Sequence, residues 1–308
     1  MSTNREQIVW DKRSMISATN KVHKRIYKEK YNNFMNKLNF NISQIKLNFE
    51  TNKNWDLELE RVKQVDHWQT YSQPILDIRY KYILNIPDEI CQFHGLKILR
   101  LTNNSLTEIP RCVYNIINLE ELIVNSNNIR IINKNINKLV NLQHLDLSNN
   151  RLSEIPKELC QLTNLVKLEL DDNIINKLPK DFCRLVNLEI LLLSRNEIEK
   201  IPRNIYMLTK LVNFSVSCNK LKKIPKKFYQ LINLRNIWLD DNKLTEIHVD
   251  ISKLVNLRNI DLSANKLKTI PKEICQLKHL SVKLQNNPYI KLPIEVKKWH
   301  ELRLVGLY

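Results

Sequence analysis

The chain has 308 residues, a formal net charge of +17 and 43% hydrophobic residues, enough for one or two domains with a buried core. It contains only two glycines, which excludes the glycine-rich loops that bind phosphates in P-loop and dinucleotide-binding proteins. No apolar stretch approaches the length of a membrane-spanning helix, and the N-terminal sequence MSTNREQIVWDKRSM lacks the apolar centre of a secretory signal.

Residues 1–72 contain no repeat, and an amphipathic pattern indicates that this region is helical. Its apolar residues are spaced four and three apart, as on one face of a helix. They are Tyr27, Tyr31, Phe34, Leu38, Ile42, Ile45 and Phe49. We therefore predict a helical and basic N-terminal extension, which either caps the first strand of the following domain or forms a partner-binding arm.

Residues 73–308 repeat with a period of 23 residues and form the second predicted domain. Each copy fits the pattern L-x-x-L-x-L-x-x-N-x-L, and a degenerate copy around Leu76 precedes the first full one. This predicts about nine to ten repeats. The asparagine of the pattern recurs at Asn104, Asn127, Asn150, Asn173, Asn196, Asn219, Asn242 and Asn265, and at Asn287 in a last copy that is one residue shorter.

The copy LQHLDLSNNRLSEIPKELCQLTN shows what each repeat forms. The alternation of Leu145 and Leu147 predicts a short strand whose leucines point inward. Pro156 keeps the following segment extended. Leu159 and Leu162 are three apart, as in a single helical turn. One such copy cannot bury its own apolar face, so stacked copies are expected to share one continuous core.

This period and consensus are typical of leucine-rich repeats. The chain resembles most closely the soluble cytoplasmic leucine-rich repeat proteins of the Ras-suppressor class, which share the 23-residue repeat and the linker seen here as LSEIPKELCQLTNL. The resemblance implies an α/β solenoid, a curved horseshoe with parallel strands on its concave face, whose asparagines bond to the turn backbone as a ladder. It also implies a protein partner on the concave face and a role in small-GTPase or phosphatase signalling.

The outward-facing strand positions, which would form the concave face, carry mostly acids and a few apolar side chains. The acids are Asp146, Glu169, Asp171, Asp172, Asp240, Asp241 and Asp261, and the apolar residues are Ile123, Leu192 and Trp238. Trp238 with nearby acids has the composition of an interface anchor in a charged surround. The alternative is a single tolerated surface aromatic.

A column of basic residues follows the Ile-Pro or Leu-Pro pair of most repeats. It consists of Arg111, Lys134, Lys157, Lys180, Arg203, Lys226 and Lys272. Such a column is either a solvated flank that keeps the protein soluble or a contact surface for an anionic membrane, RNA or an acidic protein. Membrane and nucleic acid are the less favoured partners, because the column contains no nucleic-acid motif and no interleaved aromatics.

The remaining reactive residues do not form a recognisable site. Cys91, Cys160, Cys183 and Cys275 share one repeat position, and without a C-x-x-C pair they favour small, part-buried thiols in a reducing compartment. The histidines are scattered, and the carboxylate pairs lack the oxygens of a calcium site. Asn133 and His248, which replace the linker proline in two repeats, are interpreted as local irregularities.

We therefore predict a cytoplasmic, non-enzymatic scaffold that binds a protein partner on the concave face of the solenoid. No catalytic residue, metal, cofactor or small-molecule substrate is expected. The alternative function is an adaptor that docks on an anionic surface, such as membrane, cytoskeleton or RNA, through its basic flank and N-terminal helix.

Overall fold

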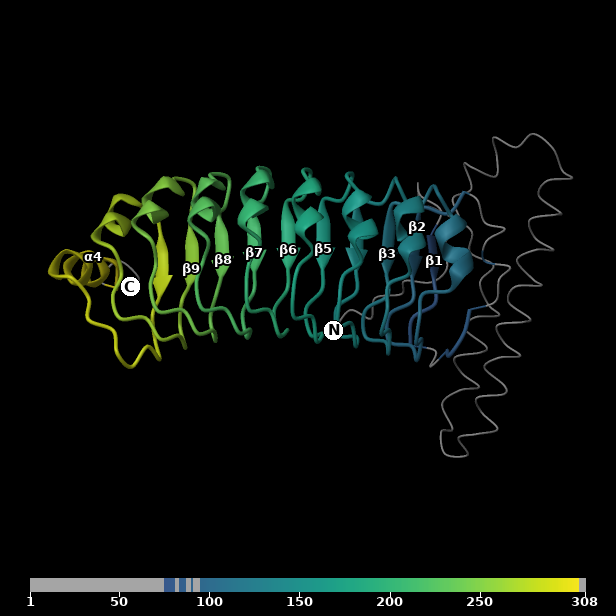
Figure 1. Cartoon of the computed structure of the whole chain (residues 1–308), viewed down its shortest axis with the longest axis horizontal. Coiled ribbons are helices and arrows are strands. Elements are labelled where there is room, and N and C mark those ends of the chain that lie inside the picture. Colours follow the sequence, from purple (N-terminus) through teal and green to yellow (C-terminus); the bar gives the residue numbers. More distant parts are fainter. Residues whose placement is uncertain (1–74, 81–82, 87–89, 91–94, 305–308) are drawn as a thin grey trace, which may run out of the picture. The chain divides into compact units, whose positions relative to one another are not determined.

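The computed structural model describes residues 75–80, 83–86, 90 and 95–304 (Figure 1). The predicted extension over residues 1–72 lies outside the described residues and stays a prediction. The chain divides after Asp146 into two compact units, and each is described by itself.

In the described part of the first unit, four short strands pair in chain order and run parallel. The strands are β1 (Ile75–Asp77), β2 (Ile98–Arg100), β3 (Glu121–Ile123) and β4 (His144–Asp146). The register matches one repeat to the next, since Leu99 is opposite Leu76 and Leu122. Two short 3-10 helices connect strands of this unit, η2 (Arg111–Asn115) and η3 (Lys134–Lys138).

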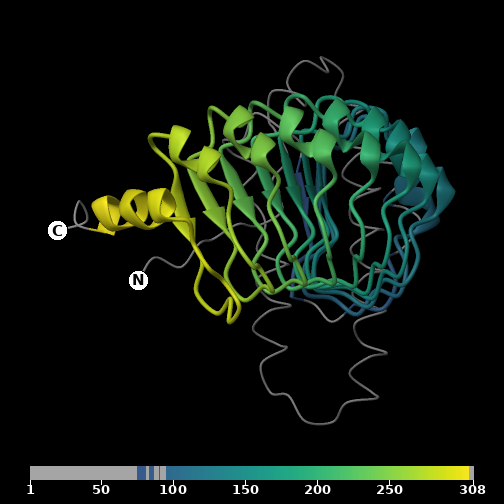
Figure 2. The same cartoon turned by 60° about the vertical axis from the view of Figure 1, so that its left-hand side comes forward.

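The second unit continues the pattern with parallel strands that also pair in chain order. They are β5 (Lys167–Glu169), β6 (Ile190–Leu192), β7 (Asn213–Ser215), β8 (Asn236–Trp238), β9 (Asn259–Asp261) and β10 (Ser281–Lys283). Its 3-10 helices are η4 (Lys157–Gln161), η5 (Lys180–Arg184), η6 (Arg203–Met207), η7 (Lys226–Gln230), η8 (Val249–Lys253) and η9 (Lys272–Gln276). Figure 2 shows these strands side by side, with helix α4 (Ile294–Leu304) following the last of them.

The core lies between the strands and the 3-10 helices and is built from the leucines of the repeat. Leu165, Leu168 and Leu170 have no exposed surface, because both the strand and the turn before it direct apolar side chains inward. Larger side chains fill the core in places, as where the rings of Phe214 and Phe228 lie 5.3 Å apart. The predicted parallel strands and leucine-rich repeat fold are thus confirmed in the described residues.

Proline sets the start of most of the 3-10 helices. Pro156 has φ −66° and ψ 144°, an extended conformation, directly before η4. The helix ends after five residues, and the backbone N–H of Leu162 donates to the carbonyl of Leu159. Leu159 and Leu162 are both fully buried, so this single turn packs against the core on the side of the repeat opposite the strand.

The chain leaves each strand through a residue with positive φ, and none of these residues is glycine. The set consists of Tyr80, Asn103, Ser126, Asn149, Asp172, Arg195, Cys218, Asp241, Ala264 and Asn286, with φ between 50° and 59°. Asparagine and aspartate tolerate this left-handed region better than other residues. The sequence did not predict this turn, because glycine is the usual residue at positive φ and the chain has only two glycines.

Candidate protein-interaction face

A ladder of asparagine side chains holds the ends of the strands. The Asn173 amide nitrogen donates to the carbonyls of Leu147 at 3.0 Å and Leu170 at 3.1 Å, and its oxygen accepts the backbone N–H of Leu152 at 2.9 Å. The equivalent bonds form around Asn104, Asn127, Asn196, Asn219, Asn242, Asn265 and Asn287. The amide of Asn150 donates to the Leu147 carbonyl at 3.1 Å. The ladder therefore fixes where the outward side chains stand.

Strand register places Trp238 in a row of outward side chains across the second unit. Its neighbours in the row are Ser215 on β7 and Asp261 on β9. Leu192 stands one strand beyond Ser215, and Lys283 one strand beyond Asp261. Adjacent strands lie about 4.8 Å apart, so a single partner segment can contact several members of this row. Trp238 itself is half-buried.

The acids near Trp238 differ in how far they are engaged within the protein. Asp261 lies 3.1 Å from the ammonium of Lys283 and accepts the backbone N–H of Ser263 at 3.1 Å. Partial burial acts against ionisation of Asp261, but the bonds from Ser263 and Lys283 outweigh it and hold its pKa below the ordinary value. Asp240 accepts the hydroxyl of Ser217. Asp241 is exposed and offers its charge outward.

A neutral amide chain borders the Trp238 row. The amide nitrogen of Asn236 donates to the side-chain oxygen of Asn213 at 2.7 Å, and that of Asn259 donates to Asn236 at 2.7 Å. Each of these carboxamides keeps a further N–H and a further lone pair for another partner. The amide chain was not among the predictions, although its three asparagines recur at the repeat period.

The acids on β5 and in the turn after it form a second group. Glu169 pairs with Lys167 at 2.8 Å, and Asp172 pairs with Arg195 at 3.4 Å. Asp171 accepts the backbone N–H of Ser194 at 2.6 Å. Burial raises the pKa of Asp171 to about 6, with smaller contributions in the same direction from the neighbouring acids. Asp171 is therefore half-protonated near pH 6.

Two predicted site residues belong to the first unit and are described apart from the others. Ile123 is half-buried on β3, where its row neighbours are Arg100 and Asp146. Asp146 is buried, so it offers little charge to a partner. The structure groups Trp238, Asp240, Asp241, Asp261 and Leu192 within the second unit.

The described residues contain no group of three or more histidines, cysteines or acids able to hold a metal ion. Within that same part of the chain, no helix is both long and apolar enough to span a membrane. The described cysteines Cys112, Cys160, Cys183, Cys218 and Cys275 are all free thiols. Burial raises the pKa of the Cys160 thiol to about 12, so it is not a reactive thiolate.

Family models agree with the fold. A model described as a leucine-rich repeat region matches residues 74–172, and a leucine rich repeat model matches residues 209–267 and 232–288. No curated protein matches the chain significantly.

Solved structures with the same fold come from bacteria and plants. A leucine-rich repeat protein of Leptospira interrogans is 32% identical with a TM-score of 0.68, and the match covers 73% of this chain and 57% of that one. The ectodomain of the Arabidopsis thaliana receptor kinase GASSHO1/SCHENGEN3, in complex with CASPARIAN STRIP INTEGRITY FACTOR 2, is 28% identical with a TM-score of 0.65, covering 73% and 28%. The plant peptide hormone receptor RGFR1, in complex with RGF2, is 25% identical with a TM-score of 0.62, covering 71% and 43%. Together with the repeat and the fold, these matches show that the chain is a leucine-rich repeat protein.

Proposed function

We propose that the chain is a non-enzymatic scaffold that binds a protein partner on the outward face of its strands, with Trp238 as the anchor. The observation that carries the proposal is the position of Trp238, half-buried in a row between Ser215 and Asp261. Aromatic anchors surrounded by polar side chains dominate the binding energy of many protein interfaces.

The surroundings of Trp238 favour a partner segment with polar and basic groups. The amide chain of Asn213, Asn236 and Asn259 offers donors and acceptors for backbone or side-chain amides. Asp241 and Asp240 supply negative charge beside it, which would steer a basic segment toward the anchor. The receptors RGFR1 and GASSHO1/SCHENGEN3 are recorded in complex with RGF2 and CASPARIAN STRIP INTEGRITY FACTOR 2, respectively.

The finer parts of the proposal are a cytoplasmic location and a role in small-GTPase or phosphatase signalling. What supports them is the 23-residue repeat and the linker shared with the Ras-suppressor class. The group formed by Glu169, Asp171 and Asp172, with Leu192, extends the proposed face toward β5 and β6. Ile123 and Asp146 stay candidates on the first unit.

The test is partner capture from the organism's lysate by wild-type protein and by Trp238→Ala, read by quantitative mass spectrometry. We expect the variant to lose affinity by about 2 kcal/mol, roughly thirtyfold, for the partner that wild type captures. Tyr289→Ala is the matched control, because Tyr289 is 71% exposed and lies outside the strands. Equal capture by wild type and Trp238→Ala would refute the proposed face.

A further inference from the structure

The linkers of the second unit carry two columns of cations on three consecutive repeats. Lys177, Lys200 and Lys223 precede the Ile-Pro or Leu-Pro pairs, and Lys180, Arg203 and Lys226 follow them. We call these six residues the linker cations. The second column opens helices η5, η6 and η7, and its members are exposed.

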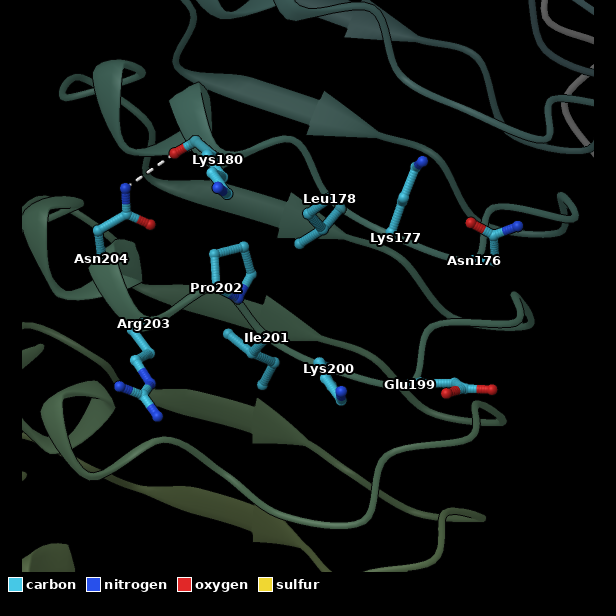
Figure 3. A pocket seen from close by; sticks show the side chains of 10 residues that line it. All are labelled: Asn176, Lys177, Leu178, Lys180, Glu199, Lys200, Ile201, Pro202, Arg203 and Asn204. Atoms are coloured by element: carbon cyan, nitrogen blue, oxygen red, sulfur yellow. Dashed lines mark hydrogen bonds between the residues drawn. The ribbon is translucent and has the colours of Figure 1, made fainter.

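A hollow of about 580 Å³ lies between two of these linkers (Figure 3). Its floor is apolar and consists of Leu178, Ile201 and Pro202, of which the first two are only 8% and 5% exposed. Asn204 ties the two linkers together by donating to the Lys180 carbonyl at 2.8 Å. The hollow is therefore shallow and has an apolar floor, and the Asn204 bond holds its two sides together.

Cations surround the apolar floor. Figure 3 shows Leu178, Ile201 and Pro202 in the middle of the hollow, with Lys177 and Lys200 toward one end and Arg203 toward the other. Glu199 is the acid among the lining residues. A ligand in the hollow would thus meet apolar contacts in the centre and positive charge at the ends.

The linker cations differ from the cations of the strand face in their pairing. On the strand face Lys167 pairs with Glu169, Arg195 with Asp172 and Lys283 with Asp261. Among the residues that the structure describes, none of the six linker cations has an acid within ion-pair distance. Lys226 acts on Asp250 beyond ion-pair distance, and the charges of Lys177, Lys200 and Arg203 at the hollow are available to a partner.

The chemistry of the hollow discriminates between anionic partners. A nucleic acid would find no aromatic side chain to stack on, and the apolar floor offers phosphates no hydrogen bond. A membrane surface is flat on this scale, and its headgroups would rest on the cations without reaching the recessed floor. In an extended polypeptide, residues two positions apart lie on the same face, so an aliphatic residue can enter the hollow while carboxylates two positions before and after it reach the cations on either side.

We propose that the hollow and the linker cations bind an acidic, aliphatic polypeptide segment of a partner protein. The segment lies extended across the linkers of two or more repeats. One aliphatic side chain occupies the space over Leu178, Ile201 and Pro202, and acids two positions before and after it pair with Lys177, Lys200 and Arg203. This site uses residues other than those of the Trp238 face, so either proposal can fail while the other holds.

The test measures binding of a short fluorescent peptide in which each leucine has a glutamate two positions before and two positions after it, with serines between them, by anisotropy in low and moderate salt. We expect Lys177→Glu with Lys200→Glu to weaken binding at least about tenfold, because two attractive contacts become repulsive. The matched control is Lys243→Glu with Lys266→Glu, which makes the same charge change at exposed lysines on consecutive repeats of the same unit. The control should change affinity by less than about threefold, because its charges act only at a distance.

A second peptide tests the apolar floor. Replacing its leucines by serines keeps the charge and should weaken binding at least about fivefold, since the aliphatic contact is lost. Equal binding of the two peptides would overturn the proposal, as would equal losses in the two double variants or no binding by wild type. Tighter binding of duplex RNA or phosphatidylserine vesicles that is lost in Lys177→Glu with Lys200→Glu would assign the surface to those partners instead.

Discussion

The phenolic oxygen of Tyr229 accepts the backbone N–H of His248, which belongs to the following repeat, at 3.3 Å. His248 stands where most repeats have proline, and it therefore carries an N–H that proline lacks. Its side chain also accepts the backbone N–H of Asp250 at 3.1 Å, at the start of η8. The buried Tyr229 thus bonds to the N–H that is present because His248 replaces the proline.

The same combination occurs once more in the described residues. Tyr114 is buried one repeat before Asn133, the other replacement of the linker proline. Burial raises its pKa, and the backbone N–H of Asn133 acts against that rise, although the phenol forms no regular hydrogen bond. Tyr206 has the same repeat position before Pro225, and it is less buried, with the Lys227 ammonium 4.5 Å from its ring centre. The two replacements share a role at the helix start, since Asn133 accepts the backbone N–H of Asn135 at 3.0 Å as His248 accepts that of Asp250, while the bond to a buried tyrosine forms at His248.

Tyr229→Phe should destabilise the protein by about 1 kcal/mol, because the His248 N–H loses its partner. His248 has φ −72° and ψ 149°, which proline can adopt. His248→Pro should therefore cost less in the Tyr229→Phe background than alone, where it leaves the buried phenol without a donor. Urea unfolding of the two single variants and the double variant measures this coupling. Additive effects would show that the two residues are independent.

Asn173→Ala should destabilise by about 1–3 kcal/mol, because it leaves the buried Leu152 N–H without its acceptor and removes one of the two amide donors to the Leu147 carbonyl. The control is Asn176→Ala, since Asn176 is exposed and lies outside the ladder. The check is the midpoint of thermal unfolding. Similar midpoints for the two variants would argue that the ladder adds nothing to stability.

Ala264→Gly should stabilise by about 0.5–1 kcal/mol, because Ala264 has φ 50° and glycine adopts that conformation without steric cost. The matched change Lys266→Gly, at an exposed residue two positions later that has no positive φ, should be neutral or destabilising. Denaturant midpoints compare the two variants. A loss of stability in Ala264→Gly would show that the left-handed turn is not strained.

Asp171 should make the stability of the protein depend on pH between its ordinary pKa of 3.8 and its folded pKa of about 6. In this window the folded state keeps a proton that the unfolded chain has released, so stability falls as the pH rises. Asp171→Asn removes the charge and keeps an acceptor for the Ser194 N–H, and it should flatten this dependence. Melting temperatures at pH 4.5 and 7 test it, with exposed Asp172→Asn as the control. An unchanged pH profile in Asp171→Asn would contradict the raised pKa.

The sequence alone determined the repeat, its strands and the single helical turn on the opposite side. These features depend on spacing along the chain: Leu145 and Leu147 alternate as in a strand, and Leu159 and Leu162 are a helical turn apart. The same pattern recurs in each repeat, so a deviation from the pattern in one copy does not change the prediction. The helical extension over residues 1–72 depends on one amphipathic pattern and stays a prediction.

Only the tertiary structure decided which charges are available to a partner. Lys283 compensates Asp261 and Lys167 compensates Glu169, whereas Lys177 and Lys200 border an apolar hollow without an acid partner among the described residues. Ion pairs of this kind depend on the register of neighbouring repeats and on side-chain direction across a distance of a few ångströms. A sequence gives residue types in each column, but it does not say which member of one column reaches which member of the next.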